Sequence, residues 1–170
     1  MRPALDSRMN VQRNSLGEVF EVSALLTFAS CKNVTISVWR STPTAVALSR
    51  IDGYISKLVN KHPKFASVIV MESTDFSAPD QAARAEHGRL TKKYEDRTFG
   101  VAMIVDGNSA RHSVYRFVMT TIQLLSAPTV TQKVFPSVGA AAGWIAGHGQ
   151  ADIERVDMIA GITDARALRA

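Results

Sequence analysis

The sequence predicts an α/β domain with a mixed, mostly parallel sheet of about five strands flanked by helices. Two segments share one pattern, in which a short apolar run leads through a polar turn into an amphipathic stretch. The apolar runs lie at 66–71 and 101–105, and the polar turns follow at 72–79 and 106–109. Repeated strand-to-helix units of this kind are typical of parallel strands joined by helical crossovers.

Length and composition fit one domain with a sizeable core, since 46% of the 170 residues are hydrophobic. The net charge is +5, but Lys and Arg are spread along the whole chain. The densest basic pair, Lys92-Lys93, stands beside Glu95 and Asp96. Nucleic acid is therefore not expected as a partner, because phosphate binding usually needs a concentrated basic patch.

Cys31 is the sole cysteine, so one chain can form neither an internal disulfide nor a cysteine-based zinc site. The four histidines lie in four different segments, and we expect no metal and no cofactor. No apolar run approaches the roughly 20 residues that cross a bilayer, and residues 1–17 lack an apolar core of the secretory kind. We therefore expect a cytoplasmic protein without a membrane span.

The first half of the chain predicts a hairpin followed by a helix. Apolar residues alternate with polar ones over 20–28 and over 34–38, and a turn at 30–33 separates the two runs. These features predict two antiparallel strands. Thr42 and Pro43 then predict the start of a helix, because a hydroxyl can cap free amides and proline is tolerated at the first helical position.

The second half alternates strands and helices, which gives the order ββαβαβαβα for the whole domain. Strands are expected at 65–71, 101–105 and 130–135, and the first of these has the continuous apolar character of a doubly covered strand. The helix expected at 78–93 has a thin buried face, formed by Ala82, Ala83, Ala85 and Leu90. The helix after the fourth strand has a wide apolar face, formed by Val114, Phe117, Val118, Thr121, Ile122 and Leu125.

Two more helices complete the chain. Ser137 is expected to cap a short helix that continues to Ile145. A last helix would bury one side formed by Ile153, Val156, Ile159 and Ala160. The predicted organisation is a flexible arm at 1–17, one domain at 18–146 and a helical C-terminal extension at 147–170.

This order of elements resembles the STAS domain, and more narrowly the SpoIIAA-like bacterial proteins. The resemblance covers about 18–146 and depends on the strands at 68–73 and 101–105, each leading to a capped helix, and on the closing segment at 134–145. It implies a non-enzymatic regulatory or scaffolding domain that binds another protein, of unknown identity, through a sheet edge or an exposed helix. STAS domains include antagonists of anti-sigma factors, and the resemblance assigns no catalytic residues here.

Some STAS domains are switched by phosphorylation within an Asp-Ser-Ser-Gly or Asp-Ser-Thr-Gly motif that begins a helix. The nearest stretch here is 77–82, where Asp80 matches the acidic position but no Ser or Thr follows it. Ser77 is therefore the candidate phosphorylation site. Ser77 and Asp80 also have the spacing of a capping box, and that structural interpretation is favoured.

An alternative function is a small-ligand-binding module for an anionic metabolite or a lipid head group. Ligands of open parallel sheets bind beyond the carboxyl ends of the strands, and amides, hydroxyls and guanidinium groups there can bind an anion. The candidate ligand-binding residues are Ser73, Asp75, Asn108, Ser109 and Arg111. Ordinary helix capping is the favoured interpretation of the Asn108-Ser109 turn.

The wide apolar face after the fourth strand supplies a candidate interface formed by Phe117, Val118 and Ile122. Burial in the core is the favoured interpretation of these side chains. A face of this width also allows a homodimer or a partner-binding surface.

Overall fold

The computed structural model describes residues 16–72, 77–116 and 129–170. The strands are β1 (Glu18–Val22), β2 (Leu26–Cys31), β3 (Val34–Trp39), β4 (Phe65–Met71), β5 (Thr98–Ile104) and β6 (Gln132–Phe135). The helices are α1 (Ala45–Lys61), α2 (Gln81–Tyr94), α4 (Val138–Gly147) and α5 (Arg155–Ala167). Residues 110–116, after β5, are also helical.

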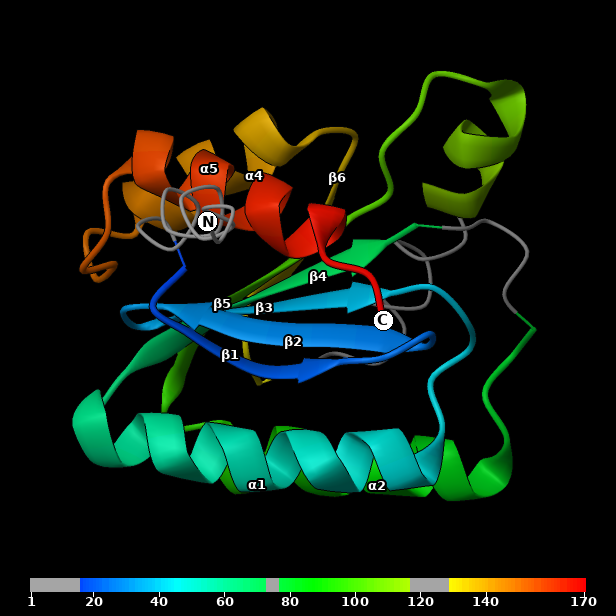
Figure 1. Ribbon diagram of the computed structural model, residues 1–170, viewed down its shortest axis with the longest axis horizontal. Helices are drawn as coiled ribbons and strands as arrows, with labels where there is room; N and C mark the ends of the chain where they lie inside the picture. Colours follow the sequence, from blue (N-terminus) through cyan, green and yellow to red (C-terminus); the bar gives the residue numbers. More distant parts are fainter. Residues whose placement is uncertain (1–15, 73–76, 117–128) are drawn as a thin grey trace, which may run out of the picture.

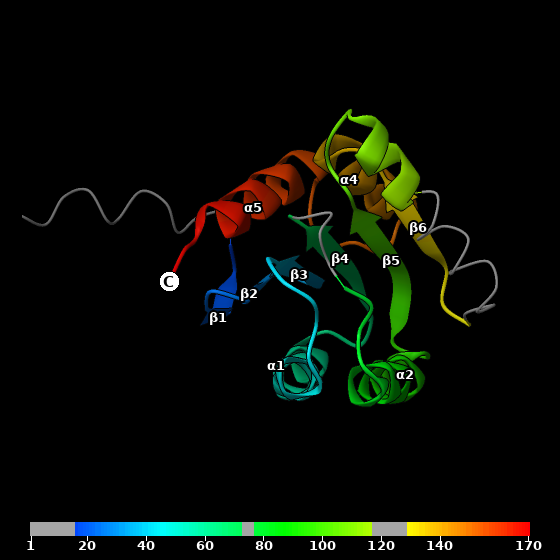
Figure 2. The same cartoon turned by 90° about the vertical axis from the view of Figure 1, so that its right-hand side faces the viewer.

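The sheet is mixed and mostly parallel, as predicted. Its order is β1-β2-β3-β4-β5-β6, and within the described ranges it has six strands instead of about five. The pairs β1–β2 and β2–β3 are antiparallel, whereas β3–β4, β4–β5 and β5–β6 are parallel. Helices α1 and α2 cover one face, and α4 and α5 cover the other (Figures 1 and 2).

The additional strand arises because the segment predicted as one strand at 20–28 is a hairpin. The chain reverses after β1, where the Ser23 amide donates to the Leu26 carbonyl at 2.9 Å and the Leu26 amide donates to the Ser23 hydroxyl at 3.1 Å. The prediction of a single long strand was therefore wrong. Alternation alone could not reveal the reversal, since both strands of a hairpin keep a period of two.

The first two helices begin later than predicted. Thr44, not Thr42, caps α1, and its hydroxyl accepts the Ala47 amide at 3.2 Å. Asp80, not Ser77, caps α2, and its carboxylate accepts the Ala83 amide at 2.7 Å. The later start of α2 has a physical reason, because Pro79 disfavours helical backbone at the residue before it.

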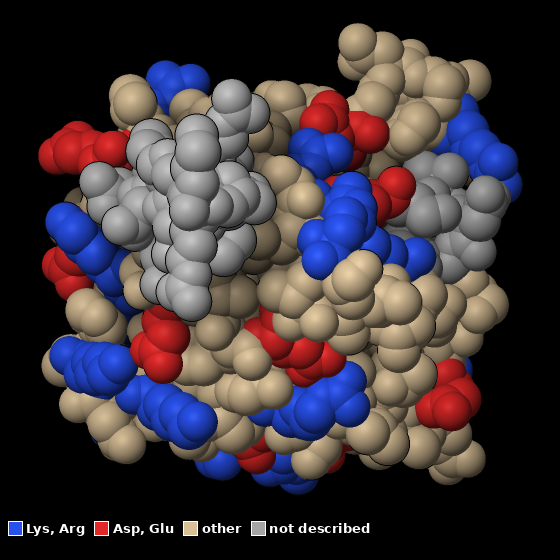
Figure 3. Space-filling view, viewed as in Figure 1, with Lys and Arg blue, Asp and Glu red and all other residues tan. Residues whose placement is uncertain are grey.

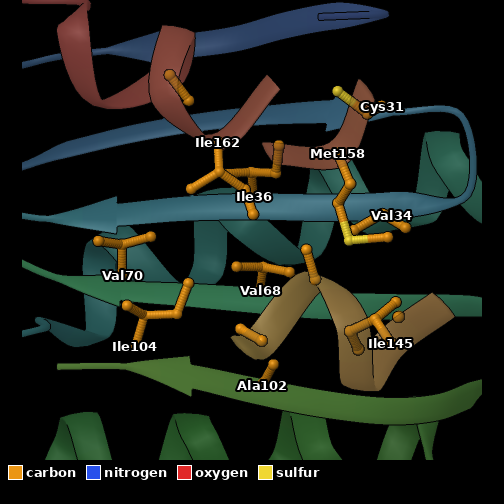
Figure 4. Close-up of a cluster of buried hydrophobic side chains, with 14 of the residues drawn as sticks. Cys31, Val34, Ile36, Val68, Val70, Ala102, Ile104, Ile145, Met158 and Ile162 are labelled. Carbon is orange, nitrogen blue, oxygen red and sulfur yellow. The ribbon is translucent and has the colours of Figure 1, made fainter. Parts of the chain in front are cut away.

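One hydrophobic core lies between the sheet and the α4–α5 layer (Figure 4). Met158, Ile162 and Ala165 of α5 are 0% exposed there. The face predicted for this helix was wrong at Val156, which is 74% exposed, whereas Ile159 packs against this core and is partly buried. Ile153 is buried but precedes α5. Helical spacing counted from Ile153 therefore does not match the positions that α5 buries.

A second core lies between the sheet and the α1–α2 layer. On α1 the buried residues include Leu48, Ile51, Ile55 and Leu58. On α2 the buried residues are Ala83, Leu90 and Tyr94. The assignment of Ala82 and Ala85 to the buried face was wrong, because both are exposed.

The β2–β3 turn closes one end of the first core. Cys31 is buried there, and burial raises the pKa of its thiol to about 11. Asn33 is also buried, and its amide nitrogen donates to the Gln150 carbonyl at 2.8 Å while its oxygen accepts the Asp152 amide at 2.8 Å. These bonds tie the turn to the loop before α5.

Candidate functional site

The loop after β5 presents three of the residues predicted to bind a ligand. Asn108, Ser109 and Arg111 are exposed at the start of the helical segment 110–116. Ser73 and Asp75, the other two, lie outside the described residues. The loop therefore supplies only part of the predicted constellation.

Ser109 acts as a helix cap in this loop. Its hydroxyl accepts the His112 amide at 3.4 Å and lies 2.5 Å from Nδ1 of the His112 ring, and its carbonyl accepts the Ser113 amide at 3.1 Å. The hydroxyl is thus engaged by groups of its own helical turn.

Arg116, which was not among the predicted residues, fastens the same loop from the helical side. Its guanidinium donates to the carbonyls of Val105 and Gly107, both at 2.8 Å. Gly107 has a φ of +139°, and a Cβ at this position would lie 2.7 Å from atoms of the His112 ring. The loop therefore requires glycine here, for its backbone conformation and for the space beside the ring.

A cluster of five charged side chains occupies the carboxyl ends of the parallel strands. We call it the strand-end cluster, and its members are Arg40, Glu72, Asp106, Arg166 and Arg169. The Glu72 carboxylate lies 3.1 Å from Nε of Arg40, 3.6 Å from Arg166 and 3.5 Å from Arg169. Arg166 also pairs with Asp106 at 3.0 Å. The cluster joins the ends of β3, β4 and β5 to the end of α5.

Arg40 is the most enclosed member of the cluster. Its side chain is 13% exposed, and burial, followed by the nearby Arg169 charge, lowers its pKa. The guanidinium also donates to the Leu168 carbonyl at 2.8 Å and to the Thr27 hydroxyl at 3.0 Å. Carboxylates and carbonyls of the protein itself thus pair with these arginines, which favours a fastening role for the cluster over anion binding.

The sequence offered one signal for this cluster. Arg40 and Glu72 each directly follow a buried strand, which places them at the same edge as the neighbouring strand ends. Their partners Arg166 and Arg169 lie on and beyond a helix far along the chain, so no local spacing could connect them.

A hollow lies on the opposite helical layer, between the N-terminal halves of α1 and α2. We call it the α1–α2 groove. It has a volume of about 450 Å³ and is lined by Ala45, Val46, Ser49, Ala82, Ala85, Glu86 and Arg89. Val46 is 66% exposed beside this hollow. Val46 is also the residue that could have indicated the groove from the sequence, because it is an apolar residue outside the buried face of its helix.

Ion pairs tie the two groove helices together. The Asp52 carboxylate of α1 accepts from Arg89 and Lys93 at 2.7 Å each and from the Tyr94 hydroxyl at 2.6 Å. Burial opposes the ionisation of Asp52, but hydrogen bonds from Lys93, Tyr94 and Arg89 outweigh it and lower the pKa to about 2. The charged form of Asp52 is therefore the stable one in the folded protein.

Ser77 is exposed and lies before the α2 cap. Its hydroxyl is 3.0 Å from the Thr42 hydroxyl, and Thr42 also donates to the Ser77 carbonyl at 3.3 Å. This contact joins the segments that lead into the two groove helices.

The predicted interface residues Phe117, Val118 and Ile122 lie outside the described residues. Val114, assigned to the same apolar face, is 63% exposed.

The described ranges hold neither a metal-binding cluster nor a membrane-spanning helix. Residues 16–72, 77–116 and 129–170 contain no group of three or more His, Cys, Asp or Glu side chains that could hold a metal ion. Over the same part of the chain, no helix has the length and apolar character needed to cross a membrane.

The charges on the face shown in Figure 3 are mixed. Lys and Arg atoms lie along the lower part of the view, over α1, and Asp and Glu atoms stand beside them. This face therefore carries interspersed charges.

Comparison with known proteins relates the chain to others by its fold. No family model matches the sequence, and no curated protein matches it. The chain is similar to a crystal structure from Shewanella loihica PV-4, described as an uncharacterized protein of the DUF3478 family with a SpoIIAA-like fold. The TM-score is 0.52 at 13% sequence identity, and the match covers 70% of this chain and 90% of the other. The chain thus has a divergent SpoIIAA-like fold, as its resemblance to STAS domains implied.

Proposed function

We propose that this SpoIIAA-like domain is a non-enzymatic regulatory domain that binds another protein through the α1–α2 groove. The resemblance to STAS domains supports the regulatory class. The groove supports the location, because it is a hollow with a mostly apolar lining on the exposed side of a helical layer.

The observation that carries this proposal is the exposure of Val46 beside a floor of small residues. A valine that is 66% exposed contributes little to the core of its own domain. Ala45, Ala82 and Ala85 leave the hollow next to it open, because their side chains are short. A partner side chain seated there would bury apolar surface on both proteins, which is the main favourable term in association.

Ser77 supplies a candidate means of regulation for this surface. A phosphate on its hydroxyl would replace the contact with Thr42 by a group of about two negative charges, next to the segments that enter both groove helices. Such a modification would alter the entrance of the groove without touching either core.

The test is site-specific photo-crosslinking in the cells that make the protein, with a benzophenone amino acid in place of Val46. The matched control carries the same amino acid in place of Val156, a similarly exposed valine on the opposite helical layer. We expect Val46 to give discrete crosslinks to another protein that Val156 does not give. Equal crosslinking at the two positions would contradict the groove as the docking surface.

A further inference from the structure

The α1–α2 layer carries a second property, its charge. Every Lys and Arg of the two helices is exposed, whereas their two acidic residues, Asp52 and Glu86, are half-buried. The basic residues are Arg50, Lys57 and Lys61 on α1 and Arg84, Arg89, Lys92 and Lys93 on α2. The two helices together therefore hold a surplus of five positive charges, which equals the net charge of the whole chain.

The acidic residues of this layer form ion pairs within the domain. Asp52 accepts from Arg89 and Lys93, and Glu86 accepts from Arg89. Arg50, Lys61 and Lys92 pair with Glu21, Glu18 and Glu95 from neighbouring segments.

Two cations of the layer remain available to a partner. Within the described residues Lys57 has no carboxylate partner, and Arg84 donates to the Pro79 carbonyl. The uncharged Thr44 caps α1, whereas the Asp80 carboxylate caps α2, so the N-terminus of α1 is the helix end that keeps its positive dipole beside the groove.

The shape of the α1–α2 layer indicates what kind of partner segment could bind there. Gly53 and Gly88 extend the small-residue surface beyond the groove, since a Cβ at either position would meet no atom within 4 Å. Val46 and Lys57 are eleven positions apart, so they lie on the same stripe of α1. A helix with apolar and acidic side chains on one face could place the apolar side chains in the groove and the acidic side chains beside Lys57 and Arg84.

We infer that the partner segment bound by the α1–α2 groove is an acidic amphipathic helix; this inference rests on the proposed function. A second copy of this layer fits poorly, because it would bring like charges together. Nucleic acid fits poorly as well, because the Arg89 guanidinium that lines the groove is already paired with the Asp52 and Glu86 carboxylates.

The experiment extends the crosslinking at Val46 in the full chain. The crosslinked segment is identified by mass spectrometry, and the yield is measured for Lys57→Glu and Arg84→Glu. Lys133→Glu is the control, because Lys133 is exposed on β6 and its reversal changes the net charge equally. We expect a segment with net negative charge and helical apolar spacing, and a yield lowered about fivefold by either groove reversal but not by the control.

The other outcomes separate the two proposals. A neutral or basic segment, or equal yields from all three charge variants, would overturn the acidic helix while leaving protein binding at the groove intact. Crosslinks to a second copy of this chain would do the same. Crosslinks to nucleic acid, or none beyond those of the Val156 control, would overturn the proposed function and this inference together.

Discussion

The two helical layers of the sheet differ in what their outward and inward surfaces do. The α4–α5 layer places Met158, Ile162 and Ala165 against the sheet with no exposure, and the strand-end cluster fastens the end of α5. The α1–α2 layer also packs on the sheet, but its outer side carries the groove, the exposed Val46 and a surplus of basic residues. Both layers thus close a core, but the outer side of α1 and α2 also carries the exposed features on which the proposed binding site rests.

The largest expected effect comes from the buried face of α5. Replacing Ile162 by Ala should lower the free energy of unfolding by about 2–5 kcal/mol, because it removes buried methylene groups and leaves a cavity. Urea denaturation followed by circular dichroism measures it. Val156→Ala on the same helix should stay within about 0.5 kcal/mol of the wild type. A similar loss of unfolding free energy in both variants would contradict the assignment of Ile162 to the buried face and Val156 to the exposed face of α5.

The strand-end cluster should show the next largest effect. Glu72→Gln removes the carboxylate beside Nε of the enclosed Arg40 and should cost about 1–3 kcal/mol of unfolding free energy. Asp106→Asn is the control, since Asp106 is 44% exposed and its pair with Arg166 should contribute about 1 kcal/mol or less. A larger loss for Asp106→Asn would show that the cluster fastens α5 differently.

A smaller, pH-dependent effect is expected in the α1–α2 layer. The folded pKa of Asp52 is about 2 and its ordinary value is 3.8, so the unfolded state takes up a proton first as the pH falls. The stabilisation from ionised Asp52 is complete above about pH 5 and disappears towards pH 2.

Urea denaturation of the wild type and of Asp52→Asn between pH 7 and pH 2 measures this contribution. We expect a difference of about 1 kcal/mol at pH 7 that shrinks as the pH falls. Asp96→Asn is the control, because Asp96 is an exposed carboxylate outside this set of ion pairs. A difference that grew towards pH 2 would contradict a lowered pKa for Asp52 in the folded protein.

The smallest effect on stability is expected at Ser77. Ser77→Glu should change the free energy of unfolding by no more than about 0.5 kcal/mol, because the side chain is exposed. The same variant should lower crosslinking from position 46, since it adds negative charge near a surface proposed to bind an acidic segment. Ser77→Ala controls for loss of the contact with Thr42, and equal crosslinking by both variants would exclude charge as the cause.

Much of the fold could be predicted because local patterns determine it. The strands β3 and β5 show alternating apolar residues and β4 a continuous apolar run, and the Ser137 hydroxyl caps α4 as expected, accepting the Ala140 amide at 3.3 Å. The hairpin between β1 and β2 and the buried face of α5 could not be read in the same way. Both depend on where a segment begins, and periodicity does not mark that position.

The sites depended still more on distant parts of the chain. The strand-end cluster brings Arg40 and Glu72 to residues about a hundred positions away, and only the docking of α5 brings them together. The groove likewise forms from two helices whose outer surfaces are ordinary when each sequence is taken alone. Val46 was the one visible sign, as an apolar residue on the polar side of its helix.

The burial of Cys31 allows a cysteine introduced on the surface to be labelled selectively with a thiol reagent. Its sulfur lies beneath α5 with a pKa of about 11, so a thiol reagent at neutral pH should find little reactive thiolate there. A cysteine introduced at position 46 could then carry a fluorophore while the native thiol stays unlabelled. The rate at which Cys31 itself is modified would report how often the α5 layer opens by local unfolding.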